Sequence, residues 1–273
     1  MDLSFFMNLA IQYWYLGIFL IGFLSSFSLF LPTTAFLVVF LLAKTFNPFM
    51  LGIVAGKWTA DKTWLLLGIV LGNLIPDLDN LAVAAATIAG LSTEGLHRTF
   101  THSLFTVAAV IIVFYIIARV TKRPRWGYLG LGLGIGILMH ILLDLLIWFN
   151  GVEILWPFPS WVNLWTNVIL PEWWSKLMLP LEFLFFALLF YTFYVMASKQ
   201  GTNGNYLRTL RFWIVLQAVL FVIFTVLIFT LESGFFIPYG ALYLFSLGLA
   251  FAVTIRMRET VEAVSRQPKP LLT

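Results

Sequence analysis

The sequence predicts an all-α, polytopic integral membrane protein, and its composition and hydropathy are the observations behind that prediction. Of the 273 residues, 61% are hydrophobic and only 10% are charged, whereas soluble domains carry about 25% charged residues. The mean hydropathy of the chain is +0.97. Because so few polar groups cannot cover a soluble core, lipid is the expected solvent and helices are the expected spanning structure.

Eight apolar stretches cross or nearly cross a bilayer, for which about 20 residues are needed. They are 10–31, 33–56, 63–90, 103–118, 127–149, 177–197, 211–231 and 235–255. Since 103–118 is short, we expect seven or eight membrane segments. Pro32 and the pair Asn47-Pro48 interrupt the first two stretches, which predicts broken or re-entrant helices near the N-terminus.

The same pattern divides the chain into four parts. We expect N-terminal membrane segments over 1–62, a central membrane domain over 63–160, C-terminal membrane helices over 161–258 and a polar tail over 259–273. The N-terminus has no basic region before its first apolar run, so we interpret it as a retained membrane segment and not as a cleaved signal peptide.

Basic residues predict how the chain is oriented. With alternating crossings from 103–118 onward, they fall on one side of the membrane, which the positive-inside rule makes cytoplasmic. The C-terminus is then cytoplasmic, and residues 77–102 and the tryptophan-rich loop 150–176 face the extracytoplasmic side. The net charge of +4 is modest and requires no nucleic-acid partner. The basic residues form three clusters, which are Arg119, Lys122, Arg123 and Arg125; Lys199, Arg208 and Arg211; and Arg256, Arg258, Arg266 and Lys269.

All three histidines lie close in sequence to three aspartates, inside apolar sequence. Ionisable side chains at membrane depth are costly and usually mark a functional site. Imidazole and carboxylate ligands suit a divalent metal such as zinc or manganese, and the absence of cysteine excludes a thiolate site. We therefore expect metal ligands among Asp77, Asp79, His97, His102, His140 and Asp144.

The first two pairs sit in irregular sequence. Asp77 and Asp79 follow a proline at a spacing of two, where they either converge on one cation or simply cap a helix. His97 and His102 are five residues apart, about 140° around an ideal helix. They would not share one helix face, so we expect a turn before the 103–118 helix, with Thr101 or Ser103 near the cap. The alternative is ordinary interfacial polar residues.

His140 and Asp144 lie four residues apart on an apolar helix and therefore point the same way. Three interpretations stay open. Both residues ligate a metal, Asp144 orients His140 from behind, or the pair is a buried hydrogen bond that fixes helix packing. Just before this pair, glycines recur every four residues in GYLGLGLGIG, a pattern that lets membrane helices approach closely.

Three further charged residues are candidates for the same face. Arg98 either holds a phosphate through paired hydrogen bonds or anchors the chain at the membrane interface. Glu153 and Glu182 are acids near the predicted site, and Glu182 equally suits the start of a helix. No Walker, G-x-S-x-G or H-E-x-x-H motif occurs in the sequence.

The segments LIPDLDN, HRTFTHSL and MHILLDLLIWFNGVEILWPF resemble, in order and spacing, the signature blocks of the YdjM-like membrane-bound metal-dependent hydrolases. The resemblance covers roughly residues 65–160 and makes 63–160 the hydrolase-like domain. The family is distantly similar to zinc-dependent phospholipase C and related single-strand nucleases, which implies a phosphodiester or phosphomonoester substrate. The six histidines and aspartates named above match the family's motif positions one by one.

The chain departs from the family pattern at three places. Asn80 stands where the family often has His, Thr99 stands where it often has Gly, and no His precedes His97. These departures imply either fewer metal ions than the family pattern suggests, with one site instead of several, or a degenerate protein. Separately, the segment LSSFSLFLPTTAFLVVFLLAKTFNPFMLGIVAG is weakly similar to the re-entrant region of DedA-type membrane proteins, although it lacks the acidic residue often found after that proline.

Together these features predict a membrane-embedded metal-dependent hydrolase acting on a lipid or lipid-linked phosphoester at the extracytoplasmic leaflet. The metal would lower the pKa of a water molecule, Asp79 would take its proton, and Arg98 would help to stabilise the developing phosphoryl charge. One alternative is an ion-coupled transporter or lipid-moving protein that uses the same groups. Another is a non-catalytic scaffold.

Overall fold

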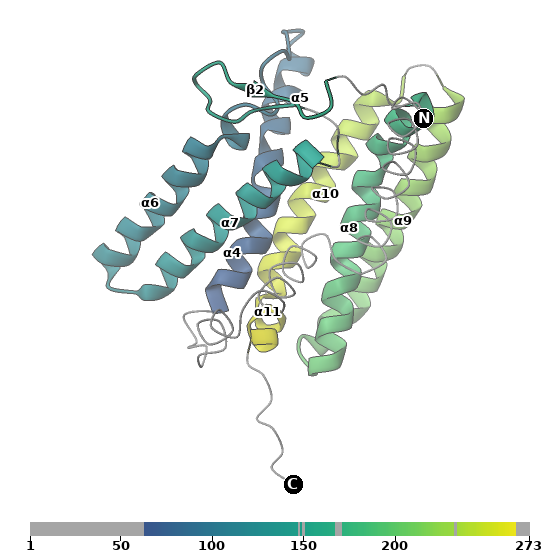
Figure 1. Cartoon of the computed structure of the whole chain (residues 1–273). Coiled ribbons are helices and arrows are strands. Elements are labelled where there is room, and N and C mark those ends of the chain that lie inside the picture. The colour runs from purple at the N-terminus through teal and green to yellow at the C-terminus, as the bar shows by residue number, and fades with distance from the viewer. Residues whose placement is uncertain (1–62, 147, 149–150, 167–170, 232–233, 266–273) are drawn as a thin grey trace, which may run out of the picture.

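The computed structural model describes residues 63–146, 148, 151–166, 171–231 and 234–265 (Figure 1). Six of its helical segments are long and apolar enough to span a membrane, which confirms an all-helical polytopic membrane protein. They correspond to the last six predicted stretches. The first two stretches, with their predicted re-entrant helices, lie outside the described residues. The six spans are Thr63–Ile88, Leu104–Thr121, Pro124–Leu146, Glu172–Gln200, Gly204–Thr230 and Phe236–Arg256.

The elements follow one another as helices with one short hairpin. The first span is divided by a 3-10 turn at Pro76–Asp79, because proline has no amide hydrogen to continue the helical ladder. A second 3-10 turn, Phe100–His102, precedes α6. The elements are α4 (Thr63–Leu74), α5 (Asn80–Ile88), α6 (Leu104–Thr121), α7 (Pro124–Leu146), β1 (Val152–Glu153), β2 (Trp161–Val162), α8 (Glu172–Gln200), α9 (Leu207–Thr230), α10 (Phe236–Arg256) and α11 (Arg258–Ser265).

Close packing of α4 against α7 is the centre of the first helix group. A Cβ atom added at Gly132 or Gly136 of α7 would collide with the backbone of α4, and one added at Gly68 or Gly72 of α4 would collide with the backbone of α7. This confirms that the glycine repeat permits close approach. Because the backbones touch, the ends of α4 and α7 are held in a fixed relation.

The remaining helices complete two groups joined by the C-terminal elements. Helix α6 packs on α7, α8 pairs with α9, and α10 and α11 contact both α4 and α8 (Figure 1). Phe183, Phe190 and Phe193 of α8 are almost fully buried in the core. By contrast, Ile112 and Ile116 of α6 are more than half exposed, as expected of side chains that face lipid.

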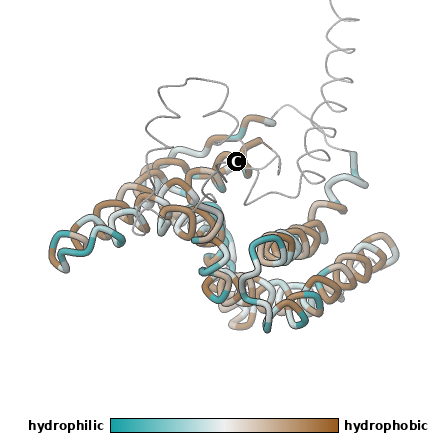
Figure 2. The backbone as a smooth tube through the Cα atoms, turned by 90° about the horizontal axis from the view of Figure 1, so that it is seen from below, coloured by the Kyte–Doolittle hydropathy of each residue, from teal (hydrophilic) through white to brown (hydrophobic). Residues whose placement is uncertain are grey.

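The two ends of the helix bundle differ in character. Helix α5 and the β1–β2 hairpin lie at one end, whereas the α6–α7 turn, the α8–α9 turn and α11 lie at the other (Figure 1). Seen from below, the helices are mainly hydrophobic and hydrophilic segments gather at their turns (Figure 2). The described basic residues of the three predicted clusters lie at the α11 end, whereas residues 77–102 lie at the hairpin end.

The structure adds three details to the sequence-based expectations. Helix α8 begins at Glu172, so Trp173 and Trp174 belong to its first turn and not to the predicted loop 150–176. The predicted tail begins with helix α11, in which Thr260 and Val261 are buried. The hairpin was not expected in an all-α chain; its strands are only two residues each, too short to show a periodic pattern.

Candidate metal centre

The site is built where three segments meet at the hairpin end. They are the 3-10 turn after α4, the loop that leads into α6, and the last turns of α7. Ser103 caps α6, as predicted, by accepting a hydrogen bond from the amide of Phe105. The Ser103 hydroxyl also lies 3.3 Å from the carbonyl oxygen of Ile154 and 3.1 Å from that of Trp156. The loop between β1 and β2 is thereby tied to the histidine-bearing loop.

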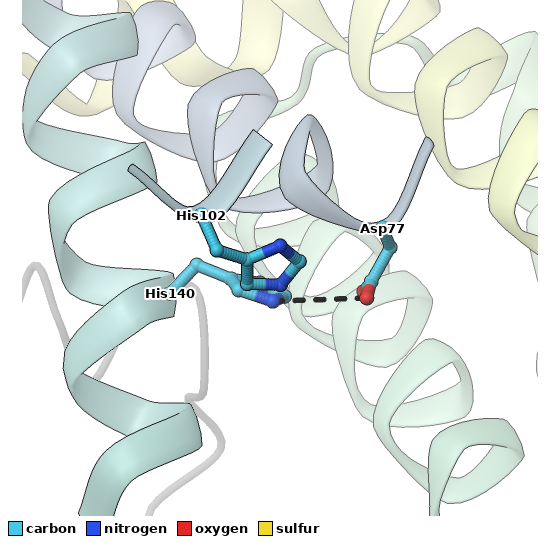
Figure 3. Close-up of side chains that lie close together, drawn as sticks. All are labelled: Asp77, His102 and His140. Atoms are coloured by element: carbon cyan, nitrogen blue, oxygen red, sulfur yellow. Dashed lines mark ion pairs between the residues drawn. The ribbon is translucent and has the colours of Figure 1, made fainter. Parts of the chain in front are cut away.

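Asp77, His102 and His140 form the first group that could hold a metal ion (Figure 3). Each offers one ligand atom, and the three atoms lie within 4.8 Å of one another. His140 Nε2 is 3.7 Å from Asp77 Oδ1. His140 Nδ1 lies 2.8 Å from the carbonyl oxygen of Asn73. Since a carbonyl only accepts, Nδ1 donates this hydrogen bond, and Nε2 faces Asp77.

His102 is completely buried and is oriented in the same way. Its Nδ1 lies 3.0 Å from the Thr101 hydroxyl oxygen, and that hydroxyl donates to Asp79 over 2.9 Å. Its Nε2 faces Asp144 Oδ2 at 3.2 Å. Burial alone lowers the pKa of His102, but the adjacent carboxylates of Asp144 and Asp79 outweigh burial and raise the pKa from 6.5 to about 9. A metal bound at His102 would therefore displace a proton.

Asp79, His97 and His102 form a second group that could hold a metal ion. Both oxygens of Asp79 are engaged. Oδ1 lies 2.7 Å from His97 Nδ1, and Oδ2 accepts hydrogen bonds from the Arg98 amide at 3.0 Å and from Thr101 at 2.9 Å. The carboxylate therefore holds the whole loop from His97 to His102. This arrangement matches a carboxylate that orients histidine ligands from behind.

Asp144 lies between Arg98, His102 and His140. Its Oδ2 is 3.2 Å from Arg98 Nε, 3.2 Å from His102 Nε2 and 3.8 Å from His140 Nε2. Among the described residues it belongs to neither three-residue ligand group. Arg98 itself adopts a left-handed backbone with φ of 63°, which costs of order 1 kcal/mol for a residue with a side chain. Hydrogen bonds at its amide and carbonyl, to Asp79 and Glu153, hold that conformation.

A cavity of about 400 Å³ opens onto these groups, which is the size range of small-molecule sites. Its polar side includes Asp77, His97 and Arg98, and its opposite wall comes from α8 and α10. Glu182 of α8 lines this cavity, whereas Glu153 does not and instead pairs with Trp161 in the hairpin. The sequence interpretation missed Asn73, Tyr239 and Tyr243, and it gave Thr101 only as a possible helix cap. The spacing of four between the two tyrosines on an apolar helix was the only signal for that pair.

The donor set fits a divalent metal. The Nε2 atoms of His102 and His140 are buried and make no hydrogen bond within the described part of the chain, although each lies near a carboxylate oxygen. Nitrogen and oxygen donors of this kind suit zinc or manganese. Where the family often has His, the Asn80 side chain donates to the backbone of Asp77. At the other departure, the Thr99 hydroxyl donates to the carbonyl of Gly95.

Residues 33–233 match the family described as YdjM inner membrane protein. The chain belongs to this family. The match is wider than the 65–160 inferred from the motifs, and it includes α8 and α9. A YdjM-family protein resides in the inner membrane with several spans. The comparisons give no support to the resemblance to DedA-type proteins, and that segment lies outside the described residues. No curated protein and no solved structure matches the chain.

Proposed function

We propose that this YdjM-family protein is a metal-dependent phosphoesterase. The observation that carries the proposal is the convergence of Asp77, His102 and His140, with both imidazoles oriented through Nδ1 so that Nε2 is available. A packing role would need only a single polar pair, whereas three ionisable groups that converge at membrane depth are costly unless they are used.

The residues divide into ligands and supports. Asp77, His102 and His140 would hold the ion; a divalent ion in such a set activates water and polarises a phosphoryl oxygen. Asn73 fixes the ring of His140, and Asp79 fixes His102 through Thr101. Because both oxygens of Asp79 already accept hydrogen bonds, we assign Asp79 to orientation and no longer to proton acceptance.

A phosphoester lipid is the substrate that best suits the position of the site. Arg98 lines the cavity and is the cation that would meet a phosphoryl group there. The site lies at the hairpin end of the spans, opposite the basic clusters. By the positive-inside rule the basic end is cytoplasmic, so the cavity would serve the extracytoplasmic leaflet.

His140→Ala in the full-length, detergent-purified protein tests the metal site. We expect the wild type to retain about one equivalent of zinc or manganese by elemental analysis and to hydrolyse bis(p-nitrophenyl) phosphate, and the variant to lose both. The control is Glu94→Gln, which changes an exposed residue at the same end of the molecule. Full metal content in the His140 variant would refute the assignment.

Orientation can be measured separately because the chain has no cysteine. Glu94→Cys and Lys122→Cys introduce single thiols at exposed positions at the hairpin end and the basic end, respectively. A membrane-impermeant maleimide added to intact cells should label the first thiol and spare the second. Labelling of Lys122→Cys alone would reverse the assigned orientation.

A further inference from the structure

The wall of the cavity that faces the metal ligands has a chemistry of its own. It is contributed by α8 and α10, and it presents Glu182, Tyr239 and Tyr243. None of these residues lies in the three motif blocks or takes part in the metal groups. The cavity therefore has one side that suits a phosphate and a metal, and another side made of a carboxylate and aromatic rings.

Glu182 lacks a cationic partner among the described residues. No ion pair in those ranges includes it, and Arg98, which shares the cavity, is paired with Asp144. Asp77 lines the same cavity, so two carboxyl groups share it with one guanidinium that is already engaged. A carboxyl group at membrane depth is costly to ionise without a cation beside it, and a positively charged ligand would offset that cost. The wall therefore favours a ligand that carries positive charge.

The aromatic rings beside Glu182 are held rigidly. The hydroxyl of Tyr239 donates to the carbonyl of Leu179 over 2.7 Å. Its ring lies nearly parallel to that of Tyr243, with an interplanar angle of 14°, and packs edge-on against Phe183. Rings whose positions are fixed in advance lose little entropy on binding. Aromatic faces beside a carboxylate suit an organic ammonium group, which binds through cation–π attraction, whereas a metal ion would require further oxygen or nitrogen donors.

We propose that Glu182, Tyr239 and Tyr243 form a subsite for the ammonium group of a zwitterionic phosphoester, such as a phosphoethanolamine or phosphocholine headgroup. The phosphate half of this assignment rests on the proposed function, whereas the ammonium half rests on the α8–α10 wall alone. A second cavity, of about 80 Å³, shares Asp77 and Glu182 with the first and lies between α7 and α8. Phe185, Phe186 and Leu189 of α8 line part of it, so an apolar surface adjoins the proposed headgroup site.

The test compares charged and neutral probes on the full-length protein in detergent. We expect zinc-loaded wild type to bind phosphocholine about tenfold more tightly than glycerol 3-phosphate, the scale of a partly desolvated cation–π and charge contact. The isosteric change Glu182→Gln should abolish that preference. Glu172→Gln, on the same helix but exposed and paired only with Lys176, should leave it unchanged. Calorimetry gives the affinities, and gel filtration checks that each variant is folded.

A measurement on wild type alone keeps the proposal falsifiable if Glu182→Gln does not fold. Choline should bind more tightly than its uncharged isostere 3,3-dimethyl-1-butanol, even after chelation of metal. Equal binding of these two compounds would overturn the subsite, and so would an unchanged phosphocholine preference in Glu182→Gln.

The same assays separate the two proposals and the two sources of the headgroup. Wild type that binds choline through Glu182 but contains no metal would support the subsite and refute the phosphoesterase. Wild type that contains metal and hydrolyses the phosphoester but shows no preference for ammonium would support the phosphoesterase and refute the subsite. In nanodiscs, faster hydrolysis of phosphatidylethanolamine or phosphatidylcholine than of phosphatidylglycerol would support a lipid source, whereas a preference confined to soluble phosphocholine would support a free headgroup.

Discussion

Replacing Gly136 with Ala should loosen the metal site from one helical turn away. The new Cβ atom would lie 2.7 Å from the amide nitrogen of Asn73, whereas ordinary contacts begin at 3.4 Å. Because the backbone oxygen of Ile69 would lie closer still, helix α4 would have to retreat by at least about 0.7 Å. Because the Asn73 carbonyl orients His140 over 2.8 Å, a shift of that size would stretch the bond to about 3.5 Å, the limit for a hydrogen bond.

The expected cost is about 1–3 kcal/mol of stability from overpacking, together with a loss of metal affinity of about 10–100-fold, as for other ligand-orienting contacts. Gly127→Ala on the same helix is the control, because its Cβ would meet only Ala118, at an ordinary 3.5 Å. Thermal unfolding and chelator competition on both purified variants provide the comparison. If Gly136→Ala matches Gly127→Ala in both measurements, the coupling between helix spacing and His140 is wrong.

Three other outcomes follow from the site and its supports. Asp79→Asn should weaken metal binding about 10–100-fold without removing a primary ligand, and chelator competition measures it; an effect as large as that of His140→Ala would make Asp79 a ligand. After chelation, the raised pKa of His102 should stabilise the protein fully below pH 6.5, and this stabilisation should be lost as pH rises through about 9. An unfolding temperature that rises over this pH range would contradict the charge assigned to His102. Zinc binding, in contrast, should become tighter as pH rises and should release a proton. Ser103→Ala should cost about 1–2 kcal/mol through the lost helix cap, whereas Thr87→Ala, an exposed hydroxyl bonded within its own helix, should change the unfolding temperature far less.

Hydropathy predicted the membrane spans well because spanning helices need long apolar runs whatever they pack against. The polar blocks likewise predicted which side chains would gather, since Asp77, His102 and His140 are unusual in such sequence, and the structure brings them together. The supports were not predictable. Asn73 acts through its backbone carbonyl, and every residue has such a group, so no sequence signal marks it.

The sequence did not reveal the α8–α10 wall of the cavity, for a different reason. Tyr239 and Tyr243 lie in a helix whose sequence resembles any lipid-facing segment, and only the packing of α10 beside α4 and α8 brings them to the cavity. The early start of α8 at Glu172 was similarly hidden, because an acidic residue followed by two tryptophans reads equally well as an interfacial loop. Tertiary contacts, and not local propensity, decided both cases.

The position of Asp144 has a consequence for how the protein matures. One carboxylate oxygen faces Arg98, His102 and His140 at once, so the two histidines and the arginine have a common anionic partner before any ion arrives. Small zinc domains that lack such an internal counter-charge fold only when the ion is present. With such a partner in place the helices would assemble without the ion, so a metal would be acquired or withdrawn afterwards without unfolding the protein.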